Sequence, residues 1–171
     1  IARKTFVFED ALNFKGKNAV AARKLISKLI EKGLIRLLAD NFYVIYSPSE
    51  RINKEISPDN FIDQMMRFKG FRYYVGLLSA ASYYGATHHR PMVYQVIIDK
   101  QLKIPKKLIH GLDFHIKKKF PINSIKKVNG YYGYINMPSK ALVAYDVLKY
   151  QSKVGGFENA FLVFSELSKT I

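Results

Sequence analysis

The chain has 171 residues, 49% of them hydrophobic, which is enough for one ordinary domain or two small ones. Its 28 Lys and Arg against 13 Asp and Glu give a formal net charge of +15, which favours nucleic acid as the partner. Cysteine is absent, which excludes disulfides and cysteine-bound zinc, and no apolar run approaches the roughly 20 residues of a membrane span, so we expect a cytoplasmic protein without a membrane partner. Residue 1 is Ile rather than Met, so we also expect a longer product.

The N-terminal part has the pattern of two short helices joined by a turn. A short helix is expected over 8–12 and a turn over 14–18, after which Asn18 can cap a helix over 19–32 that Gly33 ends. The apolar side of the second helix consists of Ala22, Leu25, Ile26, Leu29 and Ile30. Its outward side consists of Val20, Arg23, Lys24, Ser27 and Lys28, and is therefore basic.

Two β-prone runs follow, over 34–38 and 42–46, and the residues between them predict a hairpin. Helix, turn, helix and hairpin in this order are typical of a winged helix-turn-helix, with the recognition helix over 19–32 and the wing over 35–45. Residues 1–47 are therefore predicted to form a DNA-binding domain of this type. Its first helix would precede Thr5, and residues 1–4 are too few to form it, so we expect the given sequence to lack that helix.

The DNA-binding residues expected in this domain come from the recognition helix and the wing. They are Lys17, Asn18, Arg23, Lys24, Ser27, Lys28 and Arg36. Asn18 and Arg23 are the candidates for reading bases, because amide and guanidinium groups form bidentate hydrogen bonds with base edges. Taken alone, a basic helix face also fits an ordinary solvated surface helix. The hairpin and the net charge favour DNA binding.

Residues 48–57 are rich in charge and read as a linker, and residues 58–171 as an α+β domain. A helix starting at Ser57-Pro58 is expected first, with proline in its first turn. A central helix is predicted over 73–84, because apolar residues recur there at three- and four-residue steps, and Gly85 is placed to end it.

An antiparallel or mixed sheet flanked by helices is expected in this second domain. The apolar run 93–99 predicts a buried strand, and alternation over 112–117 predicts another. In the second strand Leu112, Phe114 and Ile116 are expected to face the core, and Asp113, His115 and Lys117 to face water. A hairpin over 125–135 with Asn129-Gly130 in its turn, and helices over 139–150 and 157–169, complete the prediction.

A second basic region runs from Lys100 to Lys127, with nine lysines and one acidic residue, Asp113. Lys117, Lys118 and Lys119 are consecutive, and their flexible side chains suit sequence-independent attraction to phosphate. A solvated β-sheet face explains such a run equally well.

Catalytic and metal sites are not expected. His88, His89, His110 and His115 have no carboxylate or cysteine at ligand spacing, so the histidines are better explained as capping a turn. The aspartates are scattered and no phosphate-binding loop or catalytic motif accompanies them, so we predict neither an enzyme nor a cofactor. Three tyrosines over 131–134 fit either base stacking or, preferably, packing within a sheet.

Two segments carry a family resemblance. The stretch from Tyr74 to Pro91, Tyr-Val-Gly-Leu-Leu-Ser-Ala-Ala-Ser-Tyr-Tyr-Gly-Ala-Thr-His-His-Arg-Pro, followed by Gln-Val-Ile, resembles the central motif of the AbiEi-type antitoxins. The segment 136–146, with Gly155-Gly156-Phe157 after it, is similar to a late segment of that family, where a Thr-Pro-like start leads to a helix bearing an aspartate. Met-Pro-Ser replaces that start here. The wing tip also departs, because Asp40-Asn41 stands where the family tends to have Arg-Gly.

The resemblance implies a transcriptional autorepressor that is the antitoxin of a type IV toxin–antitoxin locus for abortive-infection phage defence. Such proteins bind inverted repeats in their own promoter, which allows a dimer on DNA. They counteract a nucleotidyltransferase toxin encoded beside them, typically without a stable complex, and residues 58–171 would be the antitoxin domain. The alternative is a basic module that binds nucleic acid or protein without promoter specificity.

Overall fold

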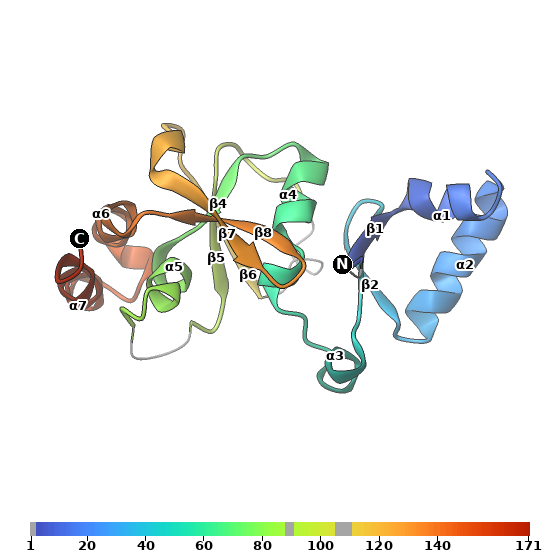
Figure 1. Cartoon of the computed structure of the whole chain (residues 1–171), viewed down its shortest axis with the longest axis horizontal. Coiled ribbons are helices and arrows are strands. Elements are labelled where there is room, and N and C mark those ends of the chain that lie inside the picture. The colour runs from blue at the N-terminus through green and yellow to red at the C-terminus, as the bar shows by residue number, and fades with distance from the viewer. Residues whose placement is uncertain (1–2, 88–90, 105–110) are drawn as a thin grey trace. The chain divides into compact units, whose positions relative to one another are not determined.

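The computed structural model describes residues 3–87, 91–104 and 111–171 (Figure 1). Its contacts group into two compact units. The first is built mainly from residues 3–69, with the short segments 103–104 and 130–133, and the second from residues 70–102, 111–129 and 134–171. Helices and small sheets are mixed along the chain, so the predicted α+β class is confirmed.

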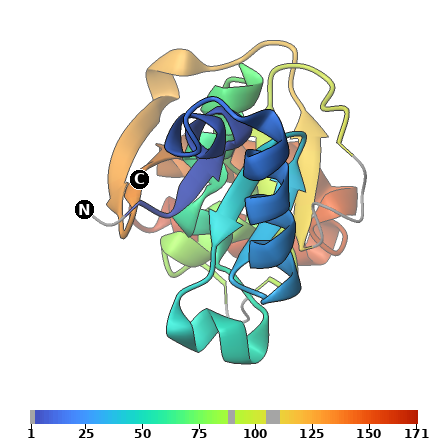
Figure 2. The ribbon, with the colours of Figure 1, turned by 90° about the vertical axis from the view of Figure 1, so that its right-hand side faces the viewer.

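The first unit begins with a small sheet and two helices. In chain order they are β1 (Thr5–Val7), α1 (Phe8–Phe14), α2 (Ala19–Glu31), β2 (Ile35–Ala39) and β3 (Phe42–Ile45). The strands form an antiparallel sheet in the order β1-β3-β2. In Figure 2 the longest blue helix of this unit is α2. The unit continues through α3 (Pro48–Asn53), the 3₁₀ turn η1 (Pro58–Asn60) and α4 (Ile62–Lys69).

Local signals in the sequence set the ends of α2. Asn18 is the N-cap, because its Oδ1 accepts the Ala21 N–H at 3.0 Å, as predicted. Gly33 follows the helix with φ of +62°, a conformation that favours glycine. Ala22 and Ile26 pack into the core beside the sheet, whereas Ile30 is exposed. The prediction that Ile30 faces inward is wrong, because at this end of the helix Leu29 packs against the core instead.

The stretch 48–57 is not irregular, since it contains α3. Glu50 accepts the backbone N–H of Ser47 at 2.7 Å, and Pro48 occupies the first turn. These are helix-start signals that the charged composition concealed. The expected helix after Ser57 begins as a 3₁₀ turn, and α4 starts only at Ile62. That residues 48–57 separate two domains stays a prediction.

The second unit contains a three-stranded sheet of mixed direction. Its strands are β4 (Tyr73–Val75), β5 (Tyr94–Ile98) and β6 (Leu112–Ile116), in that order. β4 and β5 are antiparallel, and β5 and β6 are parallel. The remaining elements are α5 (Leu77–Tyr83), the 3₁₀ turn η3 (Ile122–Ser124), the paired strands β7 (Ile125–Gly130) and β8 (Gly133–Pro138), α6 (Lys140–Lys149), the 3₁₀ turn η4 (Gln151–Lys153) and α7 (Phe157–Ser168). Within the described ranges, no helix is both long and apolar enough to cross a membrane.

The predicted central helix starts later than expected, because its first three residues form β4. Tyr73 pairs with Ile98 and Val75 with Val96, so β-prone residues are used as a strand. Gly76 then caps α5, and a Cβ at this position would lie 2.7 Å from the Ile97 side chain. Strand and helix can therefore meet here only through glycine.

The β7–β8 hairpin is also displaced by two residues from its prediction, with Tyr131 and Tyr132 in the turn. Tertiary contacts fix β8, because Ile135 and Met137 are buried and Asn136 Nδ2 donates to the Tyr73 carbonyl at 3.1 Å. These contacts outweigh the turn preference of Asn129-Gly130.

Candidate nucleic-acid interface

The outward face of α2 has the exposure that the sequence predicted. Lys17 and Asn18 are exposed just before the helix begins. The exposed residues of the helix itself are Val20, Arg23, Lys24, Ser27 and Lys28. The opposite side is buried in the core of the first unit, so packing fixes the direction in which these side chains leave the helix.

Neighbouring groups restrict three of these side chains. The Arg23 guanidinium lies 5.9 Å from the centre of the Phe8 ring, and Ser27 Oγ donates to Glu31 Oε1 at 3.0 Å. Asn18 already uses Oδ1 in the helix cap, so a bidentate contact to a base would share that oxygen or break the cap. Arg23 therefore remains the better-placed residue for bidentate contact.

The hairpin of β2 and β3 brings Arg36 opposite Val44, and Arg36 is half-buried. The register shifts between Leu37 and Ala39, and Asn41 at the tip has φ of +58°. Asp40 Oδ2 forms an ion pair with Lys69 Nζ at 3.1 Å. The tip thus carries a paired carboxylate rather than a free cation.

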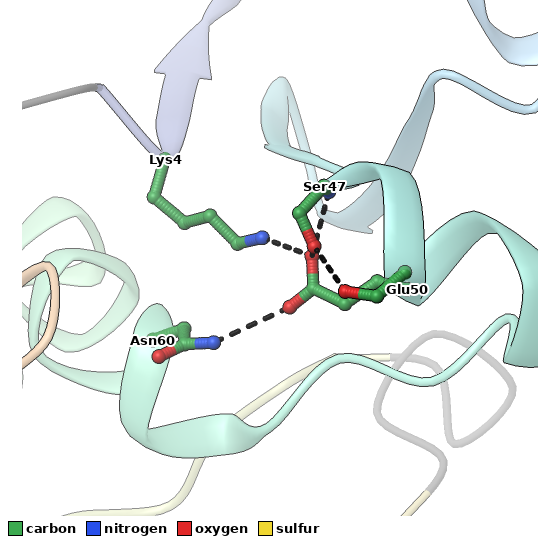
Figure 3. A network of polar contacts seen from close by, with 5 residues as sticks. Lys4, Ser47, Glu50 and Asn60 are labelled. Atoms are coloured by element: carbon green, nitrogen blue, oxygen red, sulfur yellow. Dashed lines mark hydrogen bonds and ion pairs between the residues drawn. The ribbon is translucent and has the colours of Figure 1, made fainter.

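A buried ion pair connects the start of the sheet to α3 (Figure 3). Lys4 Nζ pairs with Glu50 Oε2, which also accepts the backbone N–H and the hydroxyl of Ser47, each at 2.7 Å. Asn60 Nδ2 donates to Glu50 Oε1 at 3.3 Å. Burial raises the pKa of the Glu50 carboxyl, whereas the interactions with Lys4 and Ser47 lower it. Together these interactions outweigh burial, so the net shift of the pKa is downward. Sequence reasoning missed this network, although the Ser-Pro-Ser-Glu capping pattern at 47–50 pointed to its helix.

A second buried ion pair lies in the other unit and corrects the prediction for β6. Lys117 Nζ lies 2.5 Å from Asp146 Oδ1, and Tyr74 donates its hydroxyl to Asp146 Oδ2 at 2.6 Å. Lys117 and His115 are buried, whereas Ile116 is exposed, so the predicted orientation of these residues is wrong. The reason is that His115 and Lys117, two residues apart, lie on the same side of the chain, and on that side the Lys117 ammonium pairs with Asp146 in the core.

This pair changes which lysines can meet a phosphate. The Lys117 ammonium is held by a carboxylate in the core, so Lys117 is not accessible to DNA. Lys118 and Lys119 are exposed and stay candidates. Burial raises the pKa of the Tyr74 hydroxyl, and the Asp146 carboxylate raises it further, so this hydroxyl remains a donor.

His115 and the tyrosines over 131–134 are candidates that lie within the described residues. His115 Nε2 lies 3.0 Å from Asp113 Oδ2; burial lowers the pKa of His115, Asp113 raises it and Lys153 lowers it, and the net shift is downward. The other three histidines lie outside the described residues. Within the described part of the chain, no three His, Asp or Glu side chains gather as metal ligands would. Tyr131 and Tyr134 are exposed, so packing within the sheet does not account for either ring.

Comparison with known proteins gives a family match. Residues 74–171 match the AbiEi antitoxin C-terminal domain, which is more than half of the 171 residues. The matched range includes Tyr74, Lys117 and Asp146, the three residues of the second buried cluster. A search of curated proteins gave no match.

Proposed function

The chain belongs to the AbiEi antitoxin family, and on this premise we propose that it is a cytoplasmic antitoxin that also represses its own promoter by binding DNA. Antitoxin action in a toxin–antitoxin system follows from the family. DNA binding and repression are the proposed additions. We propose that residues 1–47 form a winged helix-turn-helix that carries them, and that the chain acts by binding rather than by catalysis.

The outward face of α2 is the observation that carries this proposal. Its three cations, Arg23, Lys24 and Lys28, are exposed on a helix whose other side is buried. The order β1-α1-α2-β2-β3, with its small antiparallel sheet, supports assigning α2 as the recognition helix and β2–β3 as the wing. The net charge of +15 supports a polyanion as partner.

Different side chains have different roles in the proposed complex. Arg23 reads bases, with Lys24 and Asn18 beside it, because it lies in the N-terminal half of α2, where recognition helices contact base edges. Lys17, Ser27, Lys28 and Arg36 contact the DNA backbone. Lys118 and Lys119 in the second unit add attraction to phosphate without reading sequence.

A titration of promoter DNA and scrambled duplex at several salt concentrations tests the proposal. Arg23→Ala should weaken promoter binding by about 1–3 kcal/mol and scrambled binding much less. Arg51→Ala is the matched control, because it removes an exposed arginine from α3 and should change neither affinity. Lys118→Ala with Lys119→Ala should weaken both duplexes alike and flatten the salt dependence by about 0.9 per lost contact.

Two results would overturn DNA repression. Equal loss on both duplexes for Arg23→Ala would indicate the alternative, a basic module without promoter specificity. Affinity that does not change with salt would exclude phosphate binding altogether.

We also propose that the toxin is a nucleotidyltransferase encoded beside this gene and that the antitoxin counteracts it without a stable complex. Full-length protein with Arg23→Ala and Lys24→Ala should lose repression of a promoter reporter and still restore growth of cells that express the toxin. Loss of both activities in a folded variant would contradict the proposal that repression and toxin neutralisation depend on different residues. Co-elution of the two purified proteins would contradict the absence of a complex.

A further inference from the structure

The outward face of α7 is apolar in a chain that is otherwise strongly basic. Phe157, Phe161 and Leu162 are 62%, 53% and 60% exposed, while Ala160 and Val163 on the other side are buried. α7 packs beside α6 at the C-terminal end of the second unit (Figure 1). The Phe157 and Phe161 rings stack at 6.2 Å. Large apolar side chains exposed along one helix commonly mark a contact surface.

Four residues on the outward side of α7 have a regular spacing. Glu158, Leu162, Ser165 and Lys169 follow one another at steps of four, three and four residues, which places them in one line along the helix. The line starts with an acidic residue and ends with a basic one at the helix C-cap. A small residue, Ser165, lies between the apolar centre and the basic end.

This line is complementary to itself when a second copy runs in the opposite direction. Glu158 then lies opposite the partner subunit's Lys169, and Leu162 lies opposite the partner subunit's Ser165, where a small side chain leaves room for it. A two-fold axis repeats each contact, which gives two ion pairs around an apolar centre. We propose that α7 is the surface through which two copies of this chain form an antiparallel dimer.

Charge favours a second copy over DNA as the occupant of this surface. One acidic and one basic residue leave the line without net charge, so DNA is not attracted to it. The acidic residue lies at one end of the line and the basic residue at the other. In an antiparallel pair related by a two-fold axis, this order places each acidic residue opposite a basic one. Lys169 pairs with Glu166 on its own helix at 2.5 Å, but both side chains are largely exposed, and such pairs contribute little and rearrange easily.

If the proposed DNA binding holds, the dimer would also contribute to repression. Two-fold proteins match inverted repeats, because each copy presents one recognition helix to one half-site. The dimer itself does not depend on DNA. It is therefore tested without DNA, and its failure is distinct from a failure of the proposed function.

Sedimentation of the full chain over about 1 to 100 µM measures the dimer directly, since association depends on concentration. The wild-type chain should pass from monomer to dimer, and Leu162→Arg should remain monomeric. Ile52→Arg is the matched control: it places the same charge on another exposed apolar residue, on α3, and should leave the dimer unchanged. Circular dichroism checks that each variant is folded.

A charge exchange tests the antiparallel direction. Glu158→Lys alone and Lys169→Glu alone should each weaken the dimer about tenfold, because every copy then meets like charges. Mixing the two variants should restore dimers near wild-type affinity, since both ion pairs re-form in the mixed dimer, one with the wild-type charges and one with the charges exchanged. A mixture as weak as the separate variants, a wild-type chain that stays monomeric throughout, or a dimer that Leu162→Arg leaves intact would overturn the proposal.

Discussion

Each unit of the chain buries one lysine against one carboxylate, and the two pairs differ in how far water reaches them. In the first unit the side chains of Lys4 and Glu50 are 3% and 15% exposed. In the second, those of Lys117 and Asp146 are 7% and 1% exposed. The carboxylate is thus the more exposed partner in the first pair and the less exposed partner in the second.

The donors around the two carboxylates differ as well. Glu50 accepts hydrogen bonds from Lys4, Ser47 and Asn60, so the loss of one donor leaves others and some water. Asp146 accepts from Lys117 and Tyr74 in the core of the antitoxin domain. A buried charge that loses its partner is costly, because desolvation is no longer offset. The comparison therefore indicates that Asp146 is the more critical carboxylate for stability.

Breaking the second pair should have the largest effect. Asp146→Ala should lower the free energy of unfolding by about 3–5 kcal/mol, because the Lys117 ammonium is left unpaired in the core. Urea denaturation measures the change. Lys117→Met together with Asp146→Leu should recover most of it, because no buried charge remains. A cost below about 1 kcal/mol for Asp146→Ala would contradict the buried pair.

Breaking the first pair should lower the free energy of unfolding by a smaller amount. Glu50→Gln should cost about 1.5–3 kcal/mol, the range for hydrogen bonds that involve a charged group. Glu55→Gln is the matched control, since Glu55 is exposed and lies in the same segment, and its effect on unfolding should be close to zero. If the two replacements cost the same, the network of Figure 3 does not hold the first unit together.

Lowering the pH should gradually remove the stability that the ionised Glu50 side chain contributes. Because the pKa of Glu50 is lowered in the folded state, its contribution is fully present above the ordinary value of 4.5 and is lost as pH falls through the folded pKa. The stability gap between wild type and Glu50→Gln should therefore close on acidification below pH 4.5. Denaturation curves at several pH values measure the gap. A gap that widens toward low pH would show that the pKa of Glu50 is raised instead.

The smallest effect is expected for Tyr74→Phe, which removes one neutral donor from Asp146 and keeps the ion pair with Lys117. Because the hydroxyl donates to a carboxylate, the cost should be about 1.5 kcal/mol, the lower end of the range for hydrogen bonds that involve a charged group. A cost equal to that of Asp146→Ala would mean that the hydroxyl, and not the ammonium, holds the carboxylate. Urea denaturation of the two variants side by side decides between these cases.

Local patterns were enough to predict much of the fold. Asn18 and Ser139 cap helices through contacts only three residues along the chain, and the exposed face of α2 follows from its apolar spacing. These features need no knowledge of distant residues. The candidate interface on α2 was accessible to sequence reasoning for the same reason.

Contacts between distant parts of the chain were not predictable in this way. Lys117 lies 29 residues from Asp146, and Tyr74 lies 72 residues from it, so alternation in β6 could not reveal the pair. The strand β4 resembled a helix because its tyrosines also fit a helical spacing, and only pairing with β5 makes it a strand. Glu50 was misjudged for the opposite reason, since its local capping signal was hidden by a charged composition typical of linkers.

The two buried lysine side chains, Lys4 and Lys117, also allow local unfolding of each unit to be followed by chemical labelling. Amine-reactive reagents modify accessible neutral amines, so the many exposed lysines should react quickly while Lys4 and Lys117 stay protected in the folded protein. Reaction at Lys4 then reports local opening of the first unit, and reaction at Lys117 reports opening of the second. Mass spectrometry of timed labelling would therefore give a separate lifetime for each unit from one sample, without any introduced probe.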